Sequence, residues 1–237
     1  MSFETISRTH VGLLRKINED SVLVDSDRGL WAVADGMGGH EAGEIASMMV
    51  TDALRCLPAA EDVDELTDRA VEALREVNGE LIDLARSNEK EQTIGTTVVG
   101  LAVADGSFRC FWMGDSRAYR LRDGELVRLT KDHSLVQTLV DAGMLTPDEA
   151  ETHENANLIT RAVGVSHVVE VDVVSGDARP GDQFLLASDG LTRLVRDDEL
   201  VRDLQNGPPA EVADNLIEKV LERGAPDNVS LIIATVA

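Results

Sequence analysis

Two Asp-Gly dipeptides stand where buried strands are expected to end. Asp35 follows the run LWAVA, and Asp189 follows the run FLLAS. Nearly continuous apolar runs are typical of interior strands, which are covered on both faces. Helix-forming sequence, not a returning strand, comes after each dipeptide. We therefore expect these two carboxylates to project from the ends of buried strands.

The chain contains two other Asp-Gly dipeptides, and these predict turns. Asp105-Gly106 and Asp123-Gly124 each lie between alternating apolar residues, which is the pattern of a β-hairpin. Glycine supplies the positive φ angle that such a turn needs, and aspartate tolerates it. These two aspartates therefore need no chemical role.

Three further segments bring acidic residues to the edge of an expected strand. Asp227 precedes the run VSLIIATV, Asp115 follows FRCFWMG, and Glu19-Asp20 ends the polar segment RKINED. If these edges converge, their carboxylates repel one another in a partly dry cleft unless cations are present. Oxygen ligands without cysteine favour hard ions, so the pattern predicts a site for Mg²⁺ or Mn²⁺ that contains Asp35.

Two other interpretations of these residues are open from the residues alone. The segment GMGGHEAG could cradle a phosphate, but Glu41 stands where the last glycine of GxGxxG belongs, and no Walker lysine follows. Asp35 and Asp189 could merely cap the helices that follow them. The metal site is favoured because several segments place a carboxylate in the same way. Gly36 would let the backbone approach closely enough for its carbonyl to be a ligand.

The elements that must position these carboxylates follow from the periodicity. The pattern predicts strands at 3–9, 20–26, 29–35, 168–176, 183–188 and 229–236, helices at 43–57, 63–87 and 209–223, consecutive strands between 95 and 130, and a polar flap at 134–157. Strands joined by hairpins, with helices in separate blocks, predict an α+β fold. Because no repeat or linker is visible, we expect a single domain over residues 1–237.

Composition excludes some partners and compartments. The 44 acidic and 22 basic residues give a net charge of −22, which repels nucleic acid and anionic membranes. The polar first 20 residues do not resemble a signal peptide, and no apolar run approaches the length that spans a bilayer. We expect a soluble, cytoplasmic protein without nucleic-acid or membrane partners, in which Cys56 and Cys110 are buried reduced thiols.

Seven short motifs connect the chain to a known family. They are, in order, RKINED, VADGMGGHEAGE, GTT, GDSRAY, LITRAVG, LLASDGL and DNVS. With these motifs the chain resembles bacterial metal-dependent Ser/Thr protein phosphatases of the PPM family (type 2C), over nearly its whole length. The resemblance implies an α-β-β-α sandwich of two antiparallel sheets flanked by helices. It also implies hydrolysis of phosphoserine and phosphothreonine by a water that two metal ions activate.

The resemblance assigns metal-binding roles to particular residues. Asp35 would bridge two Mn²⁺ or Mg²⁺ ions, the Gly36 carbonyl would be a further ligand, and Asp189 and Asp227 would bind one ion. Asp115 would help to hold a third, weaker ion together with Asp189. Glu19 and Asp20 would lie outside these ligands and hold waters at the metals.

Other residues would act on the substrate. Arg15 matches the arginine that grips the substrate phosphate, and with Asp35 and Asp189 it completes the expected catalytic set. Arg161 is either a structural ion at the edge of the core or a substrate contact. Asn228 would orient its neighbours.

The sequence departs from the family pattern at two places. Met37 stands where eukaryotic relatives have a histidine that can protonate the leaving group, and His40 either replaces it or supports the loop. In the flap, HENAN replaces the HPxRN-like sequence of many bacterial relatives, so contacts with substrate are expected to differ.

The alternative to an active enzyme is a pseudophosphatase that keeps the fold as a binding module. Lost metal ligands would mark such a module, whereas this chain retains Asp35, Asp189, Asp227 and Arg15. The expected partners are phosphorylated proteins, with a cognate Hanks-type Ser/Thr kinase whose action the phosphatase reverses.

Overall fold

The computed structural model describes residues 1–38, 42–87 and 93–237. Its strands form two sheets in which all pairings are antiparallel. The five-stranded sheet has the order β1 (Phe3–His10), β11 (Val229–Val236), β10 (Gln183–Ala187), β7 (Arg117–Arg122), β8 (Glu125–Arg128). The six-stranded sheet has the order β2 (Asp20–Asp25), β3 (Leu30–Met37), β5 (Val98–Ala104), β6 (Ser107–Met113), β9 (Asp172–Asp177), with the short β4 (Gly95–Thr96) also paired to β3.

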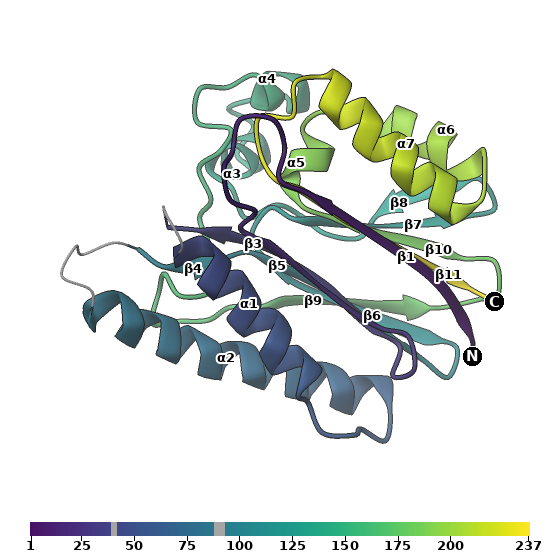
Figure 1. Cartoon of the computed structure of the whole chain (residues 1–237), viewed down its shortest axis with the longest axis horizontal. Helices are drawn as coiled ribbons and strands as arrows, with labels where there is room; N and C mark the ends of the chain where they lie inside the picture. Colours follow the sequence, from purple (N-terminus) through teal and green to yellow (C-terminus); the bar gives the residue numbers. More distant parts are fainter. Residues whose placement is uncertain (39–41, 88–92) are drawn as a thin grey trace.

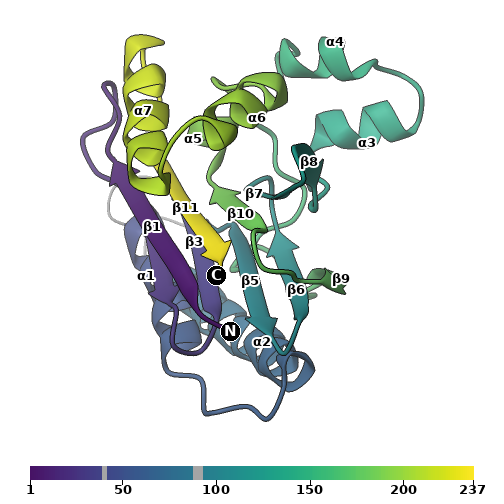
Figure 2. The same cartoon turned by 90° about the vertical axis from the view of Figure 1, so that its right-hand side faces the viewer.

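Helices cover the outer face of each sheet (Figure 1). The six-stranded sheet is covered by α1 (Ala42–Arg55) and α2 (Val63–Ser87), and the five-stranded sheet by α5 (Asp189–Thr192), α6 (Asp197–Gln205) and α7 (Pro209–Glu222). Figure 2 shows α3 (Leu135–Asp141) and α4 (Pro147–Glu151) projecting from one end of the molecule as the expected flap. The predicted α-β-β-α sandwich is confirmed.

Three apolar layers explain why the central strands are apolar on both faces. In β3, Leu30, Ala32 and Ala34 belong to the core under α1 and α2, while Trp31 and Val33 belong to the core between the sheets. The same alternation divides β10 and β11 between the inter-sheet core and the core under α5, α6 and α7. Burial of both faces is the largest stabilising contribution that such strands can make.

The two turn predictions are confirmed. Asp105 and Asp123 both have φ of 49°, and the glycines after them have φ of 76° and 85°. These dipeptides join β5 to β6 and β7 to β8 as hairpins. The chain between β6 and β7 behaves differently, because it leaves the six-stranded sheet and enters the five-stranded one. Gly114, at φ of 123°, lies at this change of sheet.

Some local expectations were wrong. Strand β9 begins at Asp172, four residues later than predicted, and helix α6 was not predicted. Helix α6 is short and polar, and it buries only Leu200 and Leu204. Cys110 is a buried thiol, but Cys56 is exposed because it follows the last residue of α1. Within the described residues, no helix combines the length and the apolar character that crossing a bilayer requires.

Candidate metal centre

The predicted carboxylates meet at one end of the sandwich. Asp20 and Asp35 lie directly opposite each other on β2 and β3. Asp35 has the same parity along β3 as Trp31 and Val33, so it faces the other sheet. That sheet contributes Asp189, which follows β10, and Asp227, which precedes the neighbouring β11. The site therefore lies between the two sheets and draws its acids from both.

Burial and the neighbouring acids both act on the Asp35 carboxyl. Desolvation raises the pKa of the Asp35 carboxyl well above its ordinary value, and the charges of Asp20, Asp189, Asp115 and Asp227 raise it further. Desolvation also raises the pKa of Asp189, and the charges of Asp227 and Asp20 act in the same direction against Arg193. So many like charges in one place are costly unless protons or cations neutralise them.

Two other acids of the cluster are perturbed in the same direction. Desolvation raises the pKa of Asp20 to about 6, although hydrogen bonds from Ser188 and Ser230 act against it. Desolvation and the charge of Asp189 raise the pKa of Asp115 to about 7. Perturbed carboxylates that face one another are typical of functional sites.

The GTT motif holds the backbone of Asp35 in place. Thr96 Oγ1 donates to the Asp35 carbonyl at 2.9 Å, and Thr97 N donates to the same carbonyl at 2.8 Å. Thr97 Oγ1 in turn accepts from Asp35 N at 3.2 Å and lies 2.8 Å from Ser116 Oγ, next to Asp115. The motif thus connects the backbone of one acid to the turn that carries another.

Gly36 is needed for close packing of backbone against backbone. A Cβ atom there would lie 2.0 Å from the Gly43 carbonyl oxygen and 2.6 Å from that of Glu19. Gly36 N also donates to the Glu19 carbonyl at 3.1 Å. The glycine therefore allows the end of β3 to approach both the first turn of α1 and the residue before β2.

A serine pair ties Asp20 to the opposite sheet. Ser188 Oγ donates to Asp20 Oδ2 at 2.9 Å and accepts from Ser230 N at 2.9 Å. Ser188 follows β10 and Ser230 lies in β11, which are neighbours in the five-stranded sheet, whereas Asp20 begins β2 of the other sheet. The Ser188–Asp20 bond therefore joins the two sheets, and the Ser230–Ser188 bond holds Ser188 in place within its own sheet. They fix the carboxylate of Asp20 within the cluster.

Asn228 fastens the loop that carries Arg15. Its Oδ1 accepts from Glu19 N at 2.8 Å, and its Nδ2 donates to the carbonyls of Val11 at 2.8 Å and Ile17 at 3.0 Å. The side chain is therefore hydrogen-bonded at both ends, and the residue is 5% exposed. The sequence predicted only that Asn228 orients its neighbours, and the structure identifies the loop that it holds.

Two arginines contact the acidic cluster. Arg15 Nη2 donates to Asp227 Oδ2 at 2.8 Å, and the Arg15 side chain remains 52% exposed. Arg193 Nε lies 2.8 Å from Asp189 Oδ2, and Arg193 Nη2 donates to Asp115 Oδ2 at 3.1 Å. Sequence reasoning missed Arg193, although its spacing of four residues from Asp189 at a helix start was an available signal.

The donor atoms suit hard divalent cations. Three carboxylate oxygens are buried without a hydrogen-bond partner: Glu19 Oε1, Asp20 Oδ1 and Asp115 Oδ1, the last on a carboxylate whose other oxygen already meets Arg193. Such orphaned anionic oxygens are costly unless a cation approaches them. Across residues 1–38, 42–87 and 93–237, no group of three or more Asp, Glu, His or Cys side chains has the arrangement that would hold a metal ion. Asp227 and Asp189 each direct an oxygen toward an arginine instead.

Arg161 lies in a different cluster. Its guanidinium is 3.1 Å from Asp172 Oδ1 and 3.4 Å from Glu170 Oε2, and it approaches His133 Nε2 at 3.4 Å. The His133 ring stacks on Trp112 with centroids 6.1 Å apart. These contacts account for Arg161 as a structural ion without requiring a substrate. The other uncertain residue, His40, lies outside the described residues.

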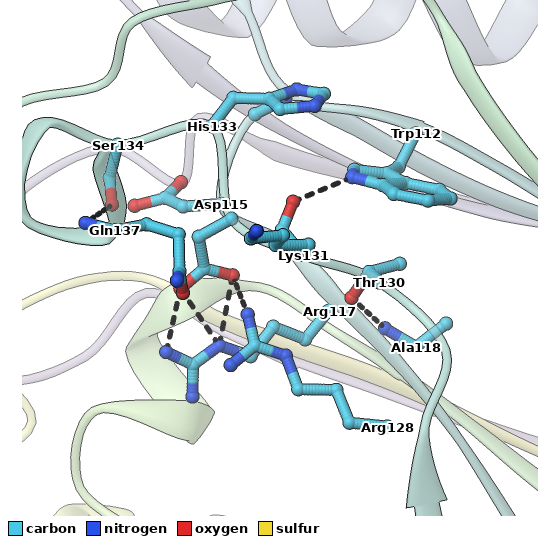
Figure 3. A network of polar contacts seen from close by, with 12 residues as sticks. Trp112, Asp115, Arg117, Ala118, Arg128, Thr130, Lys131, His133, Ser134 and Gln137 are labelled. Carbon is cyan, nitrogen blue, oxygen red and sulfur yellow. Dashed lines mark hydrogen bonds and ion pairs between the residues drawn. The ribbon is translucent and has the colours of Figure 1, made fainter. Parts of the chain in front are cut away.

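A cavity of about 600 Å³ lies next to the acidic cluster, between the flap and α5 and α6. Asp115 and Asp189 line it on one side, and the flap residues Ala156 and Asn157 on another. Figure 3 shows the polar network at its wall, where Ser134 accepts from the backbone of Gln137 at the start of α3. Residues of the altered HENAN motif therefore do reach the space beside the centre.

Comparisons with known proteins agree with this geometry. The family described as Protein phosphatase 2C matches residues 14–228. The Ser/Thr protein phosphatase PstP of Mycobacterium tuberculosis is 42% identical over 97% of this chain. The chain spans 44% of the length of PstP. The Ser/Thr phosphatase stp of Listeria monocytogenes is 36% identical, over 95% of this chain and 93% of its own length.

Among solved structures, the catalytic domain of PstP in complex with two manganese ions is similar to this fold. It is 40% identical, with a TM-score of 0.88 over 99% of each chain.

Proposed function

Because the chain belongs to the protein phosphatase 2C family, we propose that it hydrolyses phosphoserine and phosphothreonine on proteins, using two bound ions of Mn²⁺ or Mg²⁺. The observation that carries the proposal is the convergence of Asp20, Asp35, Asp115 and Asp189 on one end of the sandwich. The relatives PstP and stp are named as Ser/Thr phosphatases, and a PstP catalytic domain contains two manganese ions.

We assign the direct metal ligands to Asp35, the Gly36 carbonyl, Asp189 and Asp227. When bound, the ions would neutralise these carboxylates and make hydroxide available from water near neutral pH. Glu19 and Asp20 would hold water beside the ions through their orphaned oxygens. The resemblance also implied a third ion at Asp115, where Arg193 already supplies a positive charge.

Arg15 is assigned to the substrate phosphate. Its guanidinium is half exposed at the edge of the cluster, and the contact with Asp227 uses only Nη2. The remaining N–H groups can donate to two phosphoryl oxygens as a planar fork, which fixes the orientation of the phosphorus atom. Binding in a fixed orientation lowers the entropic part of the barrier to attack. A substrate contact by Arg161 stays a prediction beside its structural role.

The natural substrates are proposed to be proteins that a cognate Hanks-type Ser/Thr kinase phosphorylates. The cavity between the flap and α5 gives room for the polypeptide around the phosphorylated residue. Incubating the protein with the kinase domain encoded nearest to its gene, and following loss of phosphate from that kinase, tests this part of the proposal.

The central experiment compares wild-type protein with Asp35→Asn on a phosphothreonine peptide, with Mn²⁺, Mg²⁺ or EDTA. Wild type should release phosphate only with metal, and Asp35→Asn should fall to background. Asp105→Asn is the matched control, because Asp105 forms an Asp-Gly turn at φ of 49° without metal chemistry. It should behave as wild type.

Two results would contradict the proposal. Hydrolysis by Asp35→Asn, or by wild type in EDTA, would remove the metal centre from the mechanism. Binding of Mn²⁺ by the wild type without hydrolysis of any phosphopeptide would instead favour the pseudophosphatase, a binding module that keeps the fold.

A further inference from the structure

The side chain of Arg193 connects three segments at the inner end of the acidic cluster. Nε lies 2.8 Å from Asp189 Oδ2 at the start of α5, and Nη2 donates to Asp115 Oδ2 at 3.1 Å in the turn between β6 and β7. Nη2 also donates to the carbonyl of Ala156 in the flap at 3.5 Å. One guanidinium therefore reaches the turn that connects the two sheets, the start of α5 and the flap.

The local chain makes this placement favourable. Asp189 is the first residue of α5 and Arg193 is its C-cap, so the two side chains are four residues apart on one helical turn. That spacing brings an arginine over the carboxylate that precedes it. Asp115, which is 5% exposed, comes from a distant part of the chain and meets the same guanidinium.

Asp115 and Asp189 are the two residues from which the resemblance implied a third, weaker ion. In this chain one oxygen of each carboxylate already faces the guanidinium. A divalent ion at those oxygens would have to displace Arg193 or lie beside its like charge, and both are unfavourable. Arginine stays protonated at all working pH values, and its fork matches carboxylate geometry.

We propose that the Arg193 guanidinium replaces a third divalent ion between Asp115 and Asp189, so that the chain binds two ions and no third. The inference rests on the proposed function, because it presupposes a two-ion centre. The positive charge beside the flap then belongs to a side chain of the protein, so it does not change with the metal concentration. Metal dependence of the enzyme should then follow the two central ions alone.

The test counts bound Mn²⁺ by equilibrium dialysis with metal analysis, and by titration calorimetry, on the full chain. Wild type should bind two ions, and Asp115→Asn should leave that number at two. Arg193→Ala should bind a third ion in a weaker phase, and Arg193→Ala combined with Asp115→Asn should lose it again. Circular dichroism checks that each variant is folded.

Arg196→Ala is the matched control. Arg196 lines the same cavity three residues later, but it pairs with Asp198 at 3.4 Å and not with the acids of the centre. The number of Mn²⁺ ions bound by the Arg196→Ala variant should stay at two.

Two results would overturn the inference. Three ions in the wild type, one of which is lost in Asp115→Asn, would show that the guanidinium yields to a metal and would leave the proposed function intact. No bound ion in the wild type would contradict both the inference and the proposed two-ion centre.

Discussion

Replacement of Asn228 should weaken both the fold and the site, because one side chain holds the loop that carries Arg15. Three hydrogen bonds of 2.8 to 3.0 Å join it to Glu19 N and to the carbonyls of Val11 and Ile17. A buried hydrogen bond contributes about 0.5–1.5 kcal/mol, so Asn228→Ala should lower the free energy of unfolding by about 3 kcal/mol. For a chain of this length, that corresponds to a fall in Tm of about 6–12 °C.

The same change should reduce activity more than the loss of stability explains. With residues 11–19 released, Arg15 is no longer held beside Asp227, and the substrate phosphate loses a pre-positioned donor. At a temperature where the variant is fully folded, KM for a phosphothreonine peptide should rise and kcat should fall. Asn228→Asp should be as damaging as Asn228→Ala, because a carboxylate cannot donate to the two carbonyls.

The assay combines urea unfolding, followed by tryptophan fluorescence, with peptide kinetics at saturating Mn²⁺. Asn206→Ala is the control, because exposed Asn206 makes a single bond from Nδ2 to the Arg202 carbonyl. It should cost less than about 1 kcal/mol. If Asn228→Ala also costs less than 1 kcal/mol, or if its KM equals that of wild type, the loop is held by other contacts and the reasoning fails.

Three further predictions test other parts of the structure. The Glu199 carboxylate accepts hydrogen bonds from Nη1 and Nη2 of Arg223, a side chain that is 37% exposed. These hydrogen bonds lower the pKa of Glu199 to about 2. Because solvent screens this exposed pair, it should stabilise the fold by only about 1 kcal/mol at pH values above the pKa of Glu199 in the unfolded chain. That contribution is lost as the pH falls from about 4.5 toward 2. In urea unfolding, Glu199→Gln should therefore differ from wild type at pH 7 and differ less at pH 3. Gly79 lies inside α2 with open space around it, so Gly79→Ala should raise the free energy of unfolding by about 0.5–1 kcal/mol. Gly36→Ala should instead unfold or severely destabilise the chain, because the new Cβ would lie 2.0 Å from a backbone oxygen. Thermal melts of both variants test this contrast. Removal of metal with EDTA should lower Tm of the wild type and added Mn²⁺ should restore it, with little response in Asp35→Asn; an equal response in that variant would place the ions elsewhere.

The sequence predicted the parts of the fold that local pattern controls. The apolar runs of β3, β10 and β11 are visible because both faces of each strand are buried. The turns at Asp105 and Asp123 are visible because their backbone angles require particular residues. The order of strands within the two sheets was not predictable from periodicity alone, because pairing joins segments that are distant in the sequence.

The candidate site divides in the same way. Asp35 and Asp189 could be selected because a carboxylate at the end of an apolar run is unusual. Their acidic partners were selected because they also flank expected strands, and the family resemblance supplied the separate roles. The bonds of Asn228 could not be predicted, since its contact with Glu19 spans 209 residues. Arg193 was missed because its meaning depends on Asp115, 78 residues earlier, which only the folded chain brings to it.

The division of the acids between the two sheets has a mechanical consequence. Asp20 and Asp35 are attached to the six-stranded sheet, while Asp189 and Asp227 are attached to the five-stranded sheet. The interior residues Trp31 and Phe184 lie in the apolar layer between the two sheets. Ions held across that seam would resist any sliding of one half against the other. The thickness of the apolar layer between the sheets therefore also sets the distance between the ligands of one sheet and those of the other. A change in the size of a side chain in this layer would alter the metal site as well as the packing.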